Sequence, residues 1–287
     1  MIVIVPKTSG FCPGVKRAED GVFKIKETSN KVNLHGPLIH NQNYISMLQQ
    51  HNIRSVAIDS LSQGDTLVIR THGISRHEEQ TLADKFVLKD LTCPIVKRVQ
   101  KNVEKAANDN SFVIISGKAD HAEVQGLVSY AQFFLVIESN IELDLFIKDY
   151  HRVIPKKCQR IFIISQTTHS REFFEELCAT IQQNISHLPI TVKDTICAIT
   201  ENKEQESIQL QKDVDFTIVI GDSTSSNSKK LYTILKKASK NTIFIQNLIH
   251  LQQQEMSWNS INKVLVVSST STPLFIEKEI VDYLEKI

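Results

Sequence analysis

Three of the five cysteines lie at positions that suit a chemical role, such as metal binding, better than a structural role in the hydrophobic core. Cys12 follows an apolar run in Ser-Gly-Phe-Cys-Pro-Gly, Cys93 precedes a predicted helix in Thr-Cys-Pro, and Cys197 lies in Thr-Ile-Cys-Ala. By contrast, Cys178 falls on the apolar face of a predicted helix and Cys158 in a predicted loop. The first three are separated by similar lengths of chain, counted through the termini, which suggests three similar lobes that each offer one thiolate to a shared centre.

Thiolates select a limited set of metals, namely zinc, copper(I) and iron in iron–sulfur clusters. The chain holds no Cys-x-x-Cys, which disfavours a zinc ribbon or a thioredoxin motif. A fully ligated iron–sulfur cluster takes four cysteines, whereas three protein ligands leave one position open, as in catalytic metal sites. The residues alone therefore predict a metal centre with an open position and leave the metal undecided.

Five predicted strands run directly into segments rich in hydroxyl, imidazole and glycine residues. These segments are 70–73, 116–121, 165–170, 221–228 and 268–273. Helix capping needs about one Ser or Thr per loop, but these loops hold up to five. Ligands of α/β sheets bind beyond the carboxyl ends of the strands, and helix N-termini there suit an anion. We therefore predict a phosphate-type ligand, while the absence of the usual Gly-rich motifs disfavours the common modes of nucleotide binding.

The elements that position these loops follow an α/β pattern. Continuous apolar runs indicate strands buried on both faces, as in parallel sheets covered by helices. The clearest predicted strands are Ile2–Val5, Leu67–Ile69, Phe112–Ile115, Ile161–Ile164, Phe216–Ile220 and Val264–Val267. Predicted helices include Ser170–Asn184, Ile95–Asn108 and Asn227–Ala238, and an exposed loop is predicted over Lys148–Gln159. The alternation of strands and helices predicts an α/β fold.

Composition narrows the function classes. The 287 residues carry 33 Lys and Arg against 32 Asp and Glu, a balance that argues against a nucleic-acid-binding protein. No apolar run approaches the roughly 20 residues of a membrane span, and the N-terminal residues lack the basic-then-apolar order of a signal peptide. We expect a cytoplasmic protein without nucleic-acid or membrane partners, whose cysteines are reduced thiols or metal ligands.

Nine short motifs, in order along nearly the whole chain, carry a family resemblance. They are GFCPGVKRA at 10–18, HN at 40–41, THGIS at 71–75, TCP at 92–94, HAEVQG at 121–126, QTT at 166–168, TIC at 195–197, SSNS at 225–228 and STP at 271–273. In these motifs the sequence resembles the 4-hydroxy-3-methylbut-2-enyl diphosphate reductase (LytB/IspH) family, as a somewhat divergent member.

The resemblance implies three similar α/β lobes in a pseudo-threefold trefoil, with small, mostly parallel sheets around a central cluster. The lobes would be 13–93, 94–196, and 197–287 together with 1–12. The resemblance also implies one 4Fe–4S cluster, held by Cys12, Cys93 and Cys197, whose fourth iron is open to the substrate.

The reaction implied is the reductive dehydroxylation of (E)-4-hydroxy-3-methylbut-2-enyl diphosphate to isopentenyl and dimethylallyl diphosphate, the last step of the non-mevalonate isoprenoid pathway. A hydroxyl is a poor leaving group, and iron can polarise the C–O bond as a Lewis acid. A proton must also arrive. Glu123 is expected to deliver it, because a carboxyl shielded by apolar walls has a raised pKa. Thr167 would relay that proton or orient the hydroxyl, and His121 would complete the catalytic set.

The diphosphate would be bound by imidazole, hydroxyl and amide donors. Matched motif by motif, these donors are His40, His72, His121, Thr167, Ser225, Ser226, Asn227 and Ser271, with Thr168 a weaker candidate. The chain departs from the family pattern beside these positions. The departures are Lys118, Ala122, Lys203, Glu204 and Leu274.

The resemblance also implies an electron donor such as a ferredoxin or a flavodoxin. Two alternatives to this iron–sulfur oxidoreductase remain at this point. One is a non-catalytic iron–sulfur sensor of redox state or ligand on the same scaffold, although a sensor need not keep Glu123 and Thr167. The other is a structural zinc protein with three cysteine ligands and one histidine, which the wide spacing of the cysteines disfavours.

Overall fold

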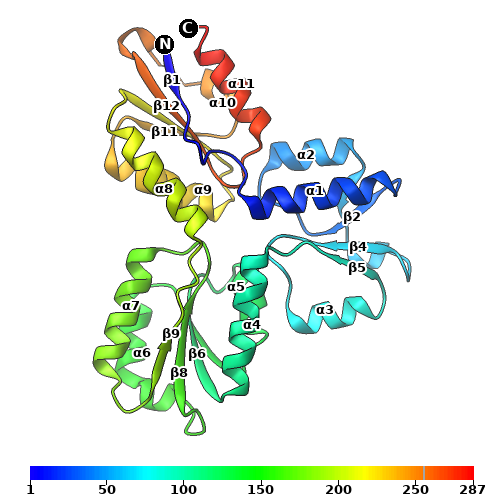
Figure 1. Ribbon diagram of the computed structural model, residues 1–287, viewed down its shortest axis with the longest axis vertical. Helices are drawn as coiled ribbons and strands as arrows, with labels where there is room; N and C mark the ends of the chain where they lie inside the picture. Colours follow the sequence, from blue (N-terminus) through cyan, green and yellow to red (C-terminus); the bar gives the residue numbers. More distant parts are fainter. Residues whose placement is uncertain (255) are drawn as a thin grey trace. The chain divides into compact units, whose positions relative to one another are not determined.

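The computed structural model describes residues 1–254 and 256–287 (Figure 1). Twelve short strands in this part of the chain form three small parallel sheets, in the orders β1-β12-β10-β11, β3-β2-β4-β5 and β7-β6-β8-β9. Helices alternate with the strands along the chain. The α/β class with parallel sheets is therefore confirmed. By their internal contacts the residues divide into two compact units, Met1–Val56 with Ala198–Ile287, and Ala57–Cys197. The division into three lobes stays a prediction.

The first unit contains one four-stranded sheet and one further pair of strands. Its sheet has the order β1-β12-β10-β11, and β2 pairs with β3. The strands are β1 (Ile2–Ile4), β2 (Val32–His35), β3 (Ile53–Ser55), β10 (Phe216–Ile220), β11 (Thr242–Ile245) and β12 (Lys263–Ser268). The helices are α1 (Pro13–Glu27), α2 (Gln42–Gln50), α8 (Ala198–Gln211), α9 (Ser226–Ala238), α10 (Leu248–Gln252), α11 (Leu274–Leu284) and the short 3-10 helix η2 (Trp258–Ser260).

The second unit has the same plan. Its sheet has the order β7-β6-β8-β9, and β4 pairs with β5. The strands are β4 (Thr66–Ile69), β5 (Val87–Asp90), β6 (Ser111–Ser116), β7 (Phe133–Ile137), β8 (Arg160–Ser165) and β9 (Ile190–Val192). The helices are α3 (Arg76–Ala83), α4 (Pro94–Asn108), α5 (Ala122–Val128), α6 (Asn140–Val153), α7 (Arg171–Asn184) and the 3-10 helix η1 (Ile58–Ser60).

The sheets β7-β6-β8-β9 and β1-β12-β10-β11 are covered by helices on both faces. Successive side chains of a strand point to opposite faces, so Phe112 and Ile114 pack with α6 and α7, whereas Val113 and Ile115 pack with α4 and α5. Figure 1 shows these two helix pairs on opposite sides of the sheet. In the first unit α10 and α11 cover one face, and α9 covers the other. Burial on both faces explains the continuous apolar runs of the central strands.

The predicted exposed loop over Lys148–Gln159 is wrong in its first half. Helix α6 continues, with a kink at Asp149, to Val153, because Phe146, Ile147 and Tyr150 lie at helical spacing and pack into the core. Residues 154–159 form the loop to β8. Cys158, beyond the helix, is 4% exposed and belongs to the same core. Within residues 1–254 and 256–287, no helix has the length and apolarity that crossing a bilayer requires.

Candidate active site

In the second unit, two neighbouring strands bring two of the polar loops together. Strands β6 and β8 run parallel, with Ser116 opposite Ser165 at their carboxyl ends. The loop after β6 leads into α5, which carries Glu123 in its first turn, and the loop after β8 carries Thr167. The two side chains predicted to handle the proton therefore begin at the same edge of one sheet.

Glu123 and Thr167 form a closed pair. The Thr167 backbone N–H donates to Glu123 Oε1 at 2.7 Å, and the Thr167 hydroxyl donates to Oε2 at 2.8 Å. Glu123 is only 1% exposed, and Val124 and Leu127 of the same helix pack into the core around it. Burial raises the pKa of Glu123 to about 7, because desolvation outweighs the two hydrogen bonds that favour the carboxylate. A carboxyl of this kind can hold a proton at neutral pH.

Two histidines lie beside this pair. His121 is the N-cap of α5, and its Nδ1 accepts from the Glu123 backbone N–H at 3.2 Å. Its ring meets the His72 ring edge to face, with 5.4 Å between centroids. His72 is presented by a turn in which Gly73 has φ +74°, and a Cβ there would come within 3.1 Å of the Gln100 amide nitrogen. A glycine is required at this turn, because the backbone is left-handed and the space is occupied.

Backbone hydrogen bonds attach two of the cysteines to the same loops. The Cys93 N–H donates to the Thr71 carbonyl at 2.9 Å, and the Cys197 N–H donates to the Thr167 carbonyl at 2.8 Å. Cys93 is therefore fixed next to the turn that carries His72, and Cys197 next to the acid–hydroxyl pair. The second unit thus links six of the predicted site residues through consecutive contacts. They are Cys93, His72, His121, Glu123, Thr167 and Cys197.

In the first unit, hydroxyl and amide groups gather at the ends of two other neighbouring strands, β10 and β12, where Ile220 lies opposite Ser268. The Ser225 and Ser271 hydroxyls are hydrogen bonded at 3.0 Å, and the Asn227 amide donates to the Thr270 hydroxyl at 2.6 Å. Ser225 is also the N-cap of α9, whose first turn contains Ser226 and Asn227. The side chains are polar and uncharged, and a helix N-terminus adds N–H donors suited to an anion.

Asp222 connects the segment that carries His40 with this cluster. Nothing in the sequence pointed to this role of Asp222. Its Oδ2 accepts from the Gln42 backbone N–H at 2.9 Å, and His40 interacts with it electrostatically. Burial opposes ionisation of Asp222, but hydrogen bonds from Thr224 and Gln42 and the nearby His40 outweigh it and lower its pKa. A charged Asp222 thus orients the segment that carries His40.

Cys12 stands at the N-cap of α1 in the first unit, directly before Pro13. Its side chain makes no capping hydrogen bond, so the sulfur is not occupied in capping the N-terminus of the helix. The Lys203 ammonium, a departure from the family pattern, donates to the carbonyls of Gly10 and Ser268 at 2.6 and 2.9 Å and interacts with Cys12. Burial lowers the pKa of Lys203 to about 8, and the nearby Cys12, Glu277 and Glu206 only partly oppose this.

The cysteines are free thiols and can therefore act as soft metal ligands. All five are outside disulfide bonds, and the three proposed ligands are half-buried. Over residues 1–254 and 256–287, no group of three or more His, Cys, Asp and Glu side chains is already arranged around a metal position. The convergence of Cys12, Cys93 and Cys197 on one centre stays a prediction.

Comparisons with known proteins agree with the motifs over the whole chain. The family model of the LytB protein matches residues 3–285. A 4-hydroxy-3-methylbut-2-enyl diphosphate reductase of Clostridium perfringens (strain 13 / Type A) is 32% identical over 290 residues, covering 99% of each chain. A protein of the same name from Clostridium tetani (strain Massachusetts / E88) is 35% identical over 97% of this chain, which spans 43% of that longer protein.

A solved structure has the same fold over its full length. It is a (E)-4-hydroxy-3-methyl-but-2-enyl diphosphate reductase, described as the terminal enzyme of the non-mevalonate pathway. It aligns with 100% of this chain and 100% of its own, with a TM-score of 0.74 and 30% sequence identity.

Proposed function

The chain belongs to the LytB protein family, and we propose that it is a reductase of (E)-4-hydroxy-3-methylbut-2-enyl diphosphate. The proposed reaction removes the hydroxyl of this substrate and gives isopentenyl and dimethylallyl diphosphate. It is the last step of the non-mevalonate isoprenoid pathway. In this reaction two electrons and two protons convert an allylic C–OH into C–H and release water. The similarity to named reductases favours this enzyme over a non-catalytic sensor and over a structural zinc protein.

The observation that carries the proposal is the buried pair of Glu123 and Thr167. A carboxyl that titrates near neutrality and faces a hydroxyl is suited to general acid catalysis. When Glu123 is protonated, it can donate to the Thr167 oxygen while the Thr167 hydroxyl passes its own proton to the substrate. Burial keeps bulk water away from this path, because Glu123 is only 1% exposed.

The cysteines fit an iron–sulfur cluster in the chemistry of their donors. Cys12, Cys93 and Cys197 would hold a 4Fe–4S cluster through three thiolates, leaving one iron for the substrate. When bound, the cluster supplies electrons and a Lewis-acidic iron for the hydroxyl. Cys12 and Cys93 stand at helix N-termini, whose partial positive charge suits anionic ligands.

The diphosphate would be bound by the strand-end loops. In the first unit the donors are Ser225, Ser226, Asn227, Ser271 and His40, and in the second unit His72 and His121. Hydroxyls and the amide can turn from one another to phosphate oxygens with little rearrangement, because their present partners are mostly each other. Protonated imidazoles would add charge-assisted hydrogen bonds, which are stronger than neutral ones.

The electrons would come from a small donor such as a ferredoxin or a flavodoxin. We also propose a cytoplasmic location, which the five cysteines outside disulfide bonds support. Nothing in the balanced charge of the chain favours nucleic acid as a partner.

The test is turnover by the full chain. The protein is reconstituted anaerobically with iron and sulfide and then supplied with a chemical reductant and (E)-4-hydroxy-3-methylbut-2-enyl diphosphate. The expected result is formation of isopentenyl and dimethylallyl diphosphate. A protein that takes up iron and sulfide but gives no product would support the sensor instead.

A further inference from the structure

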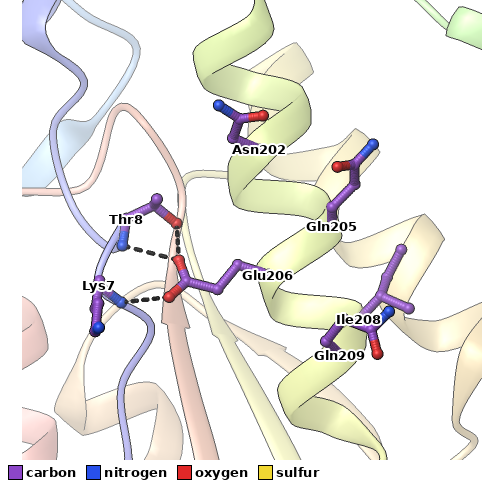
Figure 2. Close-up of a pocket in the computed structure, with 7 residues that line it drawn as sticks. All are labelled: Lys7, Thr8, Asn202, Gln205, Glu206, Ile208 and Gln209. Atoms are coloured by element: carbon purple, nitrogen blue, oxygen red, sulfur yellow. Dashed lines mark hydrogen bonds between the residues drawn. The ribbon is translucent and has the colours of Figure 1, made fainter.

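Two charged residues of helix α8 hold the segment that leads to Cys12. Residues 7–10 connect β1 to the N-cap of α1 and pass beside α8. Figure 2 shows Glu206 of α8 reaching this segment. The residues drawn there line an open pocket of about 570 Å³. Its carboxylate accepts from the backbone N–H groups of Lys7 and Thr8 at 2.9 and 3.0 Å, and from the Thr8 hydroxyl at 2.5 Å.

One turn earlier on α8, Lys203 holds the other end of the segment. Its ammonium donates to the Gly10 carbonyl at 2.6 Å, two residues before Cys12, and to the Ser268 carbonyl at 2.9 Å at the end of β12. Lys203 is only 2% exposed, so its charge has been removed almost entirely from water. A buried charge is costly unless its surroundings compensate it, and here two carbonyls and nearby anionic groups do so.

The same two stretches are joined a second time by Ser9. Its hydroxyl accepts from the Ser268 backbone N–H at 2.9 Å and donates to Glu277 of α11. The end of β12 continues into the loop that carries Ser271, one of the proposed diphosphate donors. The Lys203 ammonium therefore lies between the segment of a proposed cluster ligand and the loop of a proposed substrate donor.

We propose that Lys203 is a positioning residue, whose buried ammonium fixes the Cys12 segment against the end of β12 and holds a positive charge near Cys12. This inference deepens the proposed function, since Cys12 matters there as a cluster ligand. This role requires the charge of Lys203 as well as its shape. A methionine is about as long as lysine and resembles its apolar stem, but it offers no donor to the two carbonyls. An arginine keeps both the charge and the donors.

The chain contains a matched control. Lys236 of α9 also donates to two backbone carbonyls, those of Lys240 and Thr242, at 2.7 and 2.9 Å. Neither carbonyl belongs to a loop with a proposed site residue. Lys236→Met thus removes the same kind of bonds from the same unit without touching the Cys12 segment.

The first measurement is hydrogen exchange of the full chain before iron and sulfide are added. Loss of charge-assisted hydrogen bonds in Lys203→Met should speed exchange in residues 7–16 by about tenfold. Lys203→Arg should restore the slow exchange, and Lys236→Met should leave this segment unchanged. Unchanged exchange in Lys203→Met, or equal acceleration in Lys203→Arg, would overturn the proposal. Because no cluster is involved, the result is independent of the proposed reaction.

The second measurement is the reduction potential after anaerobic reconstitution. Removal of a positive charge near a ligand disfavours the more negative, reduced state, so Lys203→Met should shift the potential to a more negative value than in the wild type. Lys203→Arg should keep the wild-type potential. Equal potentials in all three proteins would contradict the electrostatic part of the proposal. A wild-type protein that binds no iron and sulfide would instead contradict the proposed cofactor and leave the exchange result standing.

Discussion

At the scale of single residues, the site depends on how strongly burial changes the pKa of a common side chain. Glu123 and Thr167 are common residue types, yet the near-complete burial of Glu123 raises its pKa to about 7. The two hydrogen bonds from Thr167 work in the opposite direction, since both favour the ionised form. Desolvation is the larger effect, so Glu123 can hold a proton near neutral pH, as the proposed acid must.

Replacement of the acid should slow the chemical step and spare binding. In Glu123→Gln we expect kcat to fall by about 10²–10⁴-fold with KM almost unchanged, because a positioned acid acts in the transition state. Steady-state kinetics of the reconstituted protein check this. Glu172→Gln, an exposed glutamate in the first turn of α7, is the control and should retain full activity. Near-normal turnover in Glu123→Gln would remove the residue from the mechanism.

The same carboxyl should set a pH limit on turnover. The active form is the protonated one, so kcat should fall as the pH rises through the Glu123 pKa of about 7, by about tenfold per unit once the group is ionised. A pH–rate profile measures this. The descending limb at this pH should disappear from the residual activity of Glu123→Gln, and its persistence there would assign the limb to another group.

Stability should respond to pH in the same direction. The pKa of Glu123 in the folded protein lies above its ordinary value of 4.5, so ionisation opposes folding. This contribution is fully present below about pH 4.5 and is lost as the pH rises to about 7, a change on the order of 3 kcal/mol in the free energy of unfolding. Denaturant titrations at pH 5 and pH 8 should show it as a difference between the wild type and Glu123→Gln.

At the scale of elements, helix N-termini place most of the proposed site residues. Cys12 and Cys93 precede α1 and α4, His121 precedes α5, and Ser225 precedes α9. In each unit, neighbouring parallel strands end together, so that the loops entering these helices start at one edge. Side chains distant in sequence thereby become neighbours, and the helix dipoles favour negatively charged ligands there.

Removal of one helix cap can separate stability from binding. Ser225 accepts from the Ser228 N–H at 3.3 Å, and Ser139 caps α6 in the same way, accepting from the Glu142 N–H at 3.4 Å. Each change to alanine should lower the free energy of unfolding by about 1 kcal/mol. Only Ser225→Ala should also raise KM for the diphosphate. An equal KM for the two variants would exclude Ser225 from substrate binding.

At the scale of the whole molecule, the three proposed cluster ligands come from distant parts of the sequence. Cys12 belongs to the unit built from the two chain ends, whereas Cys93 and Cys197 belong to the central one. The next residue after Cys197 begins α8, the helix whose Lys203 holds the Cys12 segment. Cluster binding should therefore stabilise the whole chain, because a ligand that binds only the folded state shifts the equilibrium towards it.

Each proposed ligand should be necessary for the cluster. Cys12→Ser, Cys93→Ser and Cys197→Ser should each lose iron and visible absorbance after anaerobic reconstitution. Cys178→Ser is the control, because that thiol packs against the core of the second unit, where burial raises its pKa to about 11. A full cluster in any of the first three variants would contradict the assignment of that cysteine.

The sequence by itself determined the fold class, the central strands and the motifs that carry chemistry. Continuous apolar runs predicted β6, β8, β10 and β12 to within a residue at each end, because burial on both faces leaves a local signal. Edge strands such as β5 and β9 were missed, since their mostly exposed residues leave no such run. Cysteines at element junctions and polar loops after strands were also readable, because both patterns are local.

Only the tertiary structure decided which of these residues meet and in what charge state. The bonds between Glu123 and Thr167 join residues 44 positions apart, and the Lys203 bond to Gly10 spans 193. Lys203 looked like a simple departure from a motif, yet burial makes it a link between two distant segments. Burial and charge compensation depend on the summed packing of the chain, so local sequence carries almost no record of them.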